Sequence, residues 1–162
     1  MKKAVCILLT VLALTSLCSC SRAEIKDDVR CADIGSLIWD ILADGIDYPE
    51  FGDTHKSFYF EDTDDYDDCY IVYSSDVNDI NEFGIFHSPN ADRAEDVYGD
   101  CIEYVEGLQK DSRDFIASYA PEELPKLDGA QVRRLGNYVI YTILPTDKSN
   151  AVFQEIENTL RK

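Results

Sequence analysis

The clearest hydrophobic pattern lies between residues 130 and 144 and predicts two antiparallel strands. The second strand, residues 138–144, is apolar almost throughout, which is typical of a strand in the interior of a sheet. Residues 130–135 are half polar, and Arg133 and Arg134 are typical of an edge strand. Gly136-Asn137 between the two runs predicts a tight turn, because such turns need a positive φ that both residues tolerate.

The predicted hairpin places Leu135 opposite Tyr138. Because successive side chains of a strand point to opposite faces, this register divides the hairpin into two sets of residues. One face carries Ala130, Val132, Val139, Tyr141 and Ile143, and the other carries Gln131, Arg133, Tyr138, Ile140 and Thr142.

Apolar residues recur every three or four positions in three further stretches, which predicts amphipathic helices. The first covers residues 25–44 and stops near Gly45. The second starts with Ser88 as N-cap and Pro89 as first helical residue, and it runs to about residue 119. Gly107 is the candidate position for a bend in it, since Gly has a helix propensity about 1 kcal/mol below that of Ala. The third follows Pro145.

Residues 69–73 and 82–86 predict two more strands, although Gly84 weakens the second. Residues 57–60 fit either a short strand or a packed loop. The resulting order is α-β-β-α-β-β-α, with each strand pair joined locally. This order predicts an α+β fold with a small antiparallel sheet of about four strands and with the helices mainly on one face.

The first residues of the chain have the pattern of a secretory signal. Lys2 and Lys3 precede an apolar run over residues 4–17, which is too short to cross a bilayer as a helix. The run ends in Leu17-Cys18-Ser19-Cys20, which resembles a bacterial lipobox with Cys20 as the lipidated residue. The alternative is an ordinary cleaved signal with an incidental cysteine. We predict a signal peptide at residues 1–19, a lipidated N-terminus and short tether at 20–26, and a single α+β domain at 27–162.

The net charge restricts the partners of this domain. It is −17 for the whole chain and becomes more negative once Lys2 and Lys3 are removed. Nucleic-acid binding is not expected, because it depends on basic patches. Anionic headgroups repel so acidic a body, so the lipid on Cys20 must hold the protein at the cell membrane, on its extracytoplasmic side.

Residues 61–68 contain six carboxylates in eight positions. Clustered carboxylates are the ligands that calcium prefers, but the spacing lacks the glycine turn and the final glutamate of an EF-hand loop. We interpret the run as a solvated acidic loop and predict no metal site. The weak candidates for an irregular cation site are Asp62, Asp64, Asp65, Asp67 and Asp68.

Catalytic motifs are scarce, and the sequence predicts neither an enzyme nor a cofactor. His55 and His87 are the only histidines, and neither has a ligand-like spacing to a cysteine or to the other histidine. The chain has no G-x-S-x-G or S-x-x-K motif and no glycine-rich phosphate loop. His87 beside Ser88 is the most site-like position, and we interpret it as an exposed loop histidine.

Three cysteines of the predicted domain remain once Cys20 carries the lipid. Cys31, Cys69 and Cys101 are an odd set, so at most one internal disulfide can form among them. We therefore predict at least one free, protected thiol.

The segment YAPEELPKLDGAQV, followed by Gly136-Asn137-Tyr138, resembles an uncharacterised lipoprotein family of Gram-positive bacteria, domain of unknown function 4358. Residues 68–75 and 82–86 resemble its earlier strand pair, and the lipobox is typical of it. The resemblance covers most of the predicted mature chain, and residues around Tyr59 and the acidic run fit it poorly. It implies a surface-anchored domain and lends no catalytic residues.

Two classes of function remain open beside an enzyme. One is a lipid-tethered module that binds a small ligand, a peptide or a cation. The other is an accessory protein that docks on a partner in the cell envelope. A concave pocket lined by several tyrosines favours the first, and a flat exposed apolar patch favours the second.

We expect Cys20→Ala to abolish lipidation and to leave an unprocessed or mislocalised precursor, because the acceptor thiol is gone. Metabolic labelling with radioactive palmitate measures this directly. Cys18→Ala is the matched control and should label as the unaltered chain does. Label retained by Cys20→Ala would place the lipid on another residue.

Overall fold

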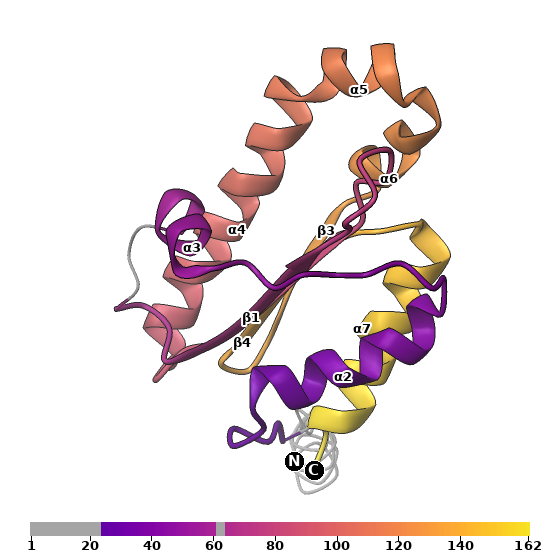
Figure 1. Cartoon of the computed structure of the whole chain (residues 1–162). Helices are drawn as coiled ribbons and strands as arrows, with labels where there is room; N and C mark the ends of the chain where they lie inside the picture. Colours follow the sequence, from indigo (N-terminus) through magenta and orange to yellow (C-terminus); the bar gives the residue numbers. More distant parts are fainter. Residues whose placement is uncertain (1–23, 61–63) are drawn as a thin grey trace, which may run out of the picture.

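The computed structural model describes residues 24–60 and 64–162. Its centre is a four-stranded antiparallel sheet with the strand order β1-β2-β4-β3 (Figure 1). The strands are β1 (Asp68–Tyr73), β2 (Glu82–His87), β3 (Gln131–Leu135) and β4 (Tyr138–Ile143).

The helices follow the predicted order, with additional short elements between them. Together with the antiparallel sheet they confirm the α+β class. They are α2 (Cys31–Leu42), α3 (Asp53–Tyr59), α4 (Ala91–Asp111), α5 (Arg113–Tyr119), the 3₁₀ turn η2 (Pro121–Glu123), α6 (Leu124–Asp128) and α7 (Thr146–Leu160).

The predicted hairpin is confirmed. Leu135 pairs with Tyr138, and the turn takes its positive φ, 65°, at Gly136. β4 is buried along its whole length and lies between β2 and β3, whereas β3 forms an edge of the sheet. The two edge arginines fold back on opposite faces, with Arg133 over the Phe153 ring of α7 and Arg134 paired with Glu95 of α4.

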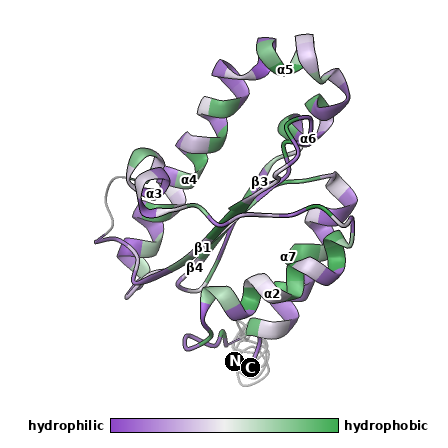
Figure 2. Ribbon diagram, viewed as in Figure 1, coloured by the Kyte–Doolittle hydropathy of each residue, from purple (hydrophilic) through white to green (hydrophobic). Residues whose placement is uncertain are grey.

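The expectation that the helices cover mainly one face is wrong. α2 and α7 pack on one face of the sheet, and α4 packs on the other (Figure 1). Alternate residues of β4 enter separate cores, with Tyr138 and Ile140 toward α2 and α7, and Val139 and Tyr141 toward α4. A strand that is apolar on both sides needs a helical layer on each. Figure 2 shows the hydrophobic residues concentrated in the strands between the two layers.

The first helix is shorter than predicted, because its expected first turns have other partners. The Lys26 N–H donates to the Leu160 carbonyl at 2.7 Å, and Ile25 forms a β-bridge with Arg161. The Tyr138 hydroxyl then binds both backbone groups of Val29. The helix ends at Leu42, and Ala43, not Gly45, caps it in the left-handed conformation.

Two other local predictions were wrong. Residues 57–60, whose sequence fits a strand or a loop, lie mostly in α3. The N-cap of α4 is Asn90, whose side chain accepts the N–H groups of Asp92 and Arg93, while Ser88 still donates its N–H to Asn137 of the hairpin turn.

The long amphipathic stretch bends at a different place from the candidate. It divides at Ser112, between α4 and α5, and the helix continues through Gly107. Glycine lowers helix propensity without preventing the backbone bonds of a helix.

The two ends of the described chain lie side by side, which defines one end of the molecule (Figure 1). Lys162 donates its backbone N–H to the Glu24 carbonyl at 2.9 Å, so the described chain is packed from Glu24 onward. The predicted signal peptide and Cys20 lie outside the described residues. Within the described part, no helix is both long and apolar enough to span a bilayer.

All three cysteines of the described residues are unpaired, which determines their expected reactivity. Cys31 and Cys101 are fully buried, and burial raises the pKa of both thiols. Cys69 is partly exposed, and burial outweighs the nearby Lys56 ammonium and raises its pKa as well. We expect a thiol reagent to modify only Cys69 in the folded domain, and slowly, because the thiolate is the reactive form. Mass spectrometry of native and denatured protein checks this, and rapid native labelling of Cys101 would contradict it.

Candidate functional site

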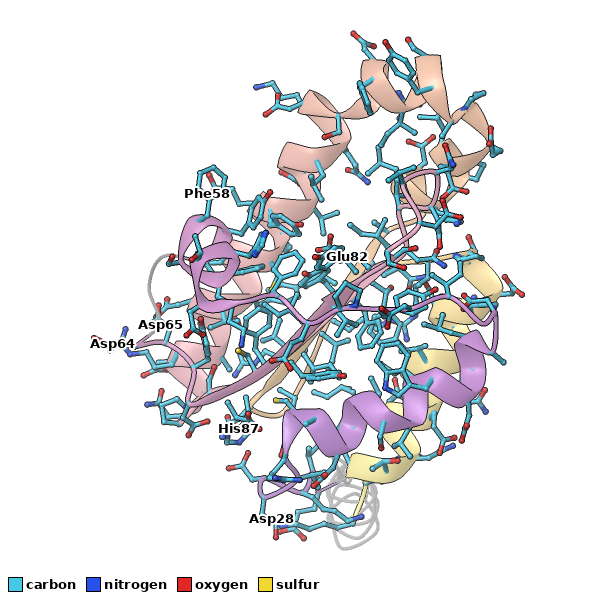
Figure 3. The ribbon with its side chains drawn as sticks, in the orientation of Figure 1. Asp28, Phe58, Asp64, Asp65, Glu82 and His87 are labelled. Atoms are coloured by element: carbon cyan, nitrogen blue, oxygen red, sulfur yellow. The ribbon has the colours of Figure 1, made fainter. Side chains whose placement is uncertain are left out.

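The acidic run does not form a common cation site among the described residues. Asp65 is only 5% exposed and pairs with Arg93, and Asp68 accepts the Cys31 N–H at 2.7 Å. Asp67 binds His87, and Asp64 is exposed, as Figure 3 shows. No three His, Cys, Asp or Glu side chains of the described part are placed to share a metal ion. The interpretation as a wholly solvated loop is therefore wrong for Asp65, and Asp62 lies outside the described residues.

His87 is not an exposed loop residue, contrary to the prediction. It is the last residue of β2, and its side chain is 15% exposed between two carboxylates. Nδ1 lies 2.6 Å from Asp67 Oδ1, and Nε2 lies 3.1 Å from Asp27 Oδ1. Burial lowers the pKa of His87, but the bonds to Asp67 and Asp27 outweigh it and leave the pKa raised. The neighbouring Ser88 hydroxyl is buried without a partner among the described residues, so the pair has no nucleophile–base geometry.

A different residue, Glu82, forms the most unusual site of the molecule. It opens β2 and lies between α4 and the sheet, far from His87 at the other end of the strand (Figure 3). Its Oε1 accepts the hydroxyl of Tyr141 at 2.6 Å and the hydroxyl of Tyr104 at 2.8 Å. The three groups come from β2, β4 and α4, so the site joins three elements.

Gly84 makes this arrangement possible. It pairs with Tyr141 across β2 and β4, and a Cβ at Gly84 would lie 2.2 Å from Cε1 of the Tyr141 ring. No real Cβ approaches so closely, so the ring occupies the space that a side chain would fill. Because Glu82 is two residues from Gly84 on the same face of β2, the Tyr141 hydroxyl reaches its carboxylate.

The carboxyl group of Glu82 titrates in the neutral range. Burial raises its pKa to about 7, although the hydrogen bonds from Tyr141 and Tyr104 act in the opposite direction. Burial and the Glu82 charge also raise the pKa of both tyrosines far above the physiological range. Both hydroxyls therefore remain donors, while Glu82 exchanges a proton near pH 7.

Glu82 lines a pocket of about 300 Å³ between the β1–β2 loop, α4, α5 and α6. We call it the Glu82 pocket. Its wall is largely apolar, with Ile80, Leu108, Phe115, Ile116, Leu127 and Ile143, and its polar members include Tyr73, Ser74 and Asp79.

A second hollow of about 530 Å³ adjoins the first. It lies between α3 and α4, and its wall includes Tyr59, Phe60 and Tyr104. Leu108 and Ser112 line both hollows, so the two follow the same part of α4 on either side of the Glu82–Tyr104 bond. Exposed aromatic rings border them, with Phe58 on α3 and Phe115 on α5.

A larger hollow, of about 770 Å³, lies beside the β3–β4 turn and is less site-like. Its wall contains Arg134 and Glu95, which bind each other at 2.5 Å, and Arg161 and Glu157, which lie 3.6 Å apart. These charges are already paired with one another. The Glu82 pocket therefore remains the candidate functional site.

Sequence reasoning missed Glu82 because its local signal is weak. A single glutamate at the start of a strand is common, and Gly84 reads as a weak point of the strand. A glycine opposite an aromatic residue on the neighbouring strand would have indicated the site. Gly84 and Tyr141 form such a pair, but recognising it requires the register between β2 and β4.

The fold is that of a small α+β domain, with a hollow of about 300 Å³ beside Glu82. The model of the family described as Domain of unknown function (DUF4358) matches residues 52–144, more than half of the chain, and the chain belongs to this family. The match includes the segment around Tyr59, which was expected to fit poorly, and also Glu82, Tyr104 and Tyr141. No curated protein and no solved structure matches the chain.

The pKa of Glu82 has a direct consequence for stability. Its folded-state pKa of about 7 lies above the ordinary 4.5, so the folded chain holds the proton more tightly than the unfolded chain. Below pH 4.5 the protonated carboxyl group contributes fully to the free energy of unfolding. This contribution, on the order of 3 kcal/mol, is lost as the pH rises from 4.5 to about 7.

We expect Glu82→Gln, which keeps the acceptor oxygen and cannot ionise, to raise Tm by roughly 5–10 °C at pH 8 and by little at pH 5. Scanning calorimetry at both pH values measures the difference. Asp147→Asn on the exposed side of α7 changes the net charge equally and serves as the control. A Glu82→Gln variant that melts below the unaltered domain at pH 8 would show that the carboxylate stabilises the fold.

Proposed function

We propose that this protein is a lipid-anchored, extracytoplasmic module that binds a small ligand in the Glu82 pocket and catalyses no reaction. The supporting observation is the pocket itself, in which an apolar wall surrounds a carboxyl group that titrates near pH 7. Ligand sites in proteins commonly combine such a wall with a few polar groups that fix the ligand's orientation.

An enzyme is the second candidate, because a glutamate with a pKa of about 7 suits a general base. The surroundings of Glu82 favour binding instead. Oε1 already accepts two tyrosine hydroxyls, and those tyrosines are held protonated. No His, Cys, Lys or Arg of the described residues lines the pocket, so a charged partner for stabilising a developing oxyanion is absent from its wall.

The proposed anchor gives the pocket an orientation. Only residues 21–23 separate Cys20 from Glu24, a chain length that reaches at most about 14 Å. An anchored domain would hold the end with the paired termini near the membrane. Residues of α5 and α6 line the pocket. These two helices lie at the end of the molecule opposite the paired termini, so an anchored domain would hold them away from the bilayer (Figure 1).

Filling the pocket tests the proposal. We expect a screen of small fragments by amide NMR to find compounds that shift the signals of the pocket residues. Leu108→Trp, which places an indole at the wall shared by both hollows, should abolish these shifts. Asn150→Trp adds the same ring to the exposed side of α7 and should leave the shifts unchanged. Shifts that survive Leu108→Trp, or a screen without any pocket shift, would overturn the proposal.

A further inference from the structure

We infer that the Glu82 pocket takes a small organic ammonium ion, with its charged head at the Glu82 carboxylate and its apolar body against α4 and α5. This inference rests on the proposed function and names the class of ligand. Four arguments support it. The pocket is lined by hydrogen-bond acceptors, its remaining wall is apolar, other classes of ligand fit it less well, and the chain is strongly acidic.

Two carboxylates line the pocket, and one of their oxygens lacks a hydrogen-bond donor. Asp79 lines it together with Glu82, and its Oδ1 accepts Lys126 Nζ at 2.6 Å and the Asn81 N–H at 3.0 Å. Its Oδ2 is buried and has no partner among the described residues. Lys126 also pairs with Glu123, so one ammonium group serves two carboxylates beside the pocket. A ligand that brings its own donors and a positive charge complements this arrangement.

The remaining wall suits the carbon skeleton of such a ligand. Leu108, Ile116, Leu127 and Ile143 supply aliphatic surface, and Phe115 and Tyr73 supply aromatic rings. Aromatic rings attract organic cations in addition to burying their apolar parts. The volume of about 300 Å³ is at the small end of known ligand pockets, which favours a ligand of one ring or a short chain.

Other ligand classes fit less well. An anion would meet the Glu82 and Asp79 carboxylates without a cation on the wall. Calcium takes six to eight oxygen ligands, and the described residues contain no group of three metal-ligating side chains. A neutral ligand would leave the ionised form of Glu82 without a counter-charge, at a free-energy cost.

The charge of the whole chain acts in the same direction. A net charge of −17 attracts cations toward the domain and repels anions, which raises the local concentration of an ammonium ion.

Binding should also depend on pH, because the ammonium ion requires ionised Glu82. With a pKa of about 7, the ionised fraction rises about tenfold between pH 6 and pH 8, and the affinity should rise with it.

Amide NMR titrations with matched probes test the inference. We expect 2-phenylethylammonium to bind at pH 8 at least about tenfold more tightly than neutral 2-phenylethanol or anionic 3-phenylpropanoate, because only the ammonium ion pairs with Glu82. Its affinity should fall about tenfold at pH 6, and a calcium titration should not shift the pocket signals.

Two variants with equal changes in net charge separate a local effect from a general one. Glu82→Gln should weaken 2-phenylethylammonium about tenfold and leave 2-phenylethanol unchanged, whereas Asp147→Asn should alter neither by more than about twofold. Equal binding of the amine and the alcohol, unaffected by Glu82→Gln, would overturn the ammonium inference while the pocket remained a ligand site. If no probe shifts the pocket signals, the inference fails, and the fragment screen with Leu108→Trp decides the proposed function separately.

Discussion

The burial of β4 on both faces is the constraint on which the rest of the structure depends. Its residues alternate between two hydrophobic cores, so the sheet is stable only with α2 and α7 on one side and α4 on the other. Both edge strands of the sheet are also covered. The arginines of β3 fold onto α7 and α4, and residues 47–51 cover β1 through backbone bonds such as Phe51 N–H to the Ile71 carbonyl at 2.8 Å.

The same two-sided burial creates the Glu82 site. Tyr141 belongs to the core beneath α4, and its ring occupies the space that a side chain would fill at Gly84, its partner on β2. The hydroxyl at the end of that ring then needs an acceptor, and Oε1 of Glu82 supplies it. The same oxygen also accepts the Tyr104 hydroxyl. The Glu82 carboxylate thus lies at the edge of the core. It also lines the pocket, together with residues of α5.

Residues whose structure depends on near neighbours were predictable from the sequence, and residues whose partners are distant were not. The Gly136-Asn137 turn, the Leu135–Tyr138 register and the interior position of β4 follow from local pattern, and the structure confirms them. The start of α2 depends on a pairing with the C-terminal residues, and the N-cap of α4 depends on Ser88 being held by the hairpin turn. The Glu82 site was missed for the same reason, since it needs the register between β2 and β4. The covering of both faces was a missed inference, because the apolar pattern of residues 138–144 already required it.

The position of Glu82 beside the pocket, without a cationic partner among the described residues, is the strongest reason to connect it with binding. A carboxyl group whose pKa is raised to about 7 by burial destabilises the folded domain wherever it is ionised, and a glutamine would fill the same space without that cost. Structural carboxylates of this protein behave differently: Asp68 caps the start of α2, and Asp65 neutralises Arg93. Glu82 has neither a cationic partner nor a backbone N–H partner among the described residues, and its two donors are uncharged. A cationic ligand in the adjoining pocket would provide the missing counter-charge. The free energy that the buried, ionised carboxylate costs would then be recovered as binding free energy.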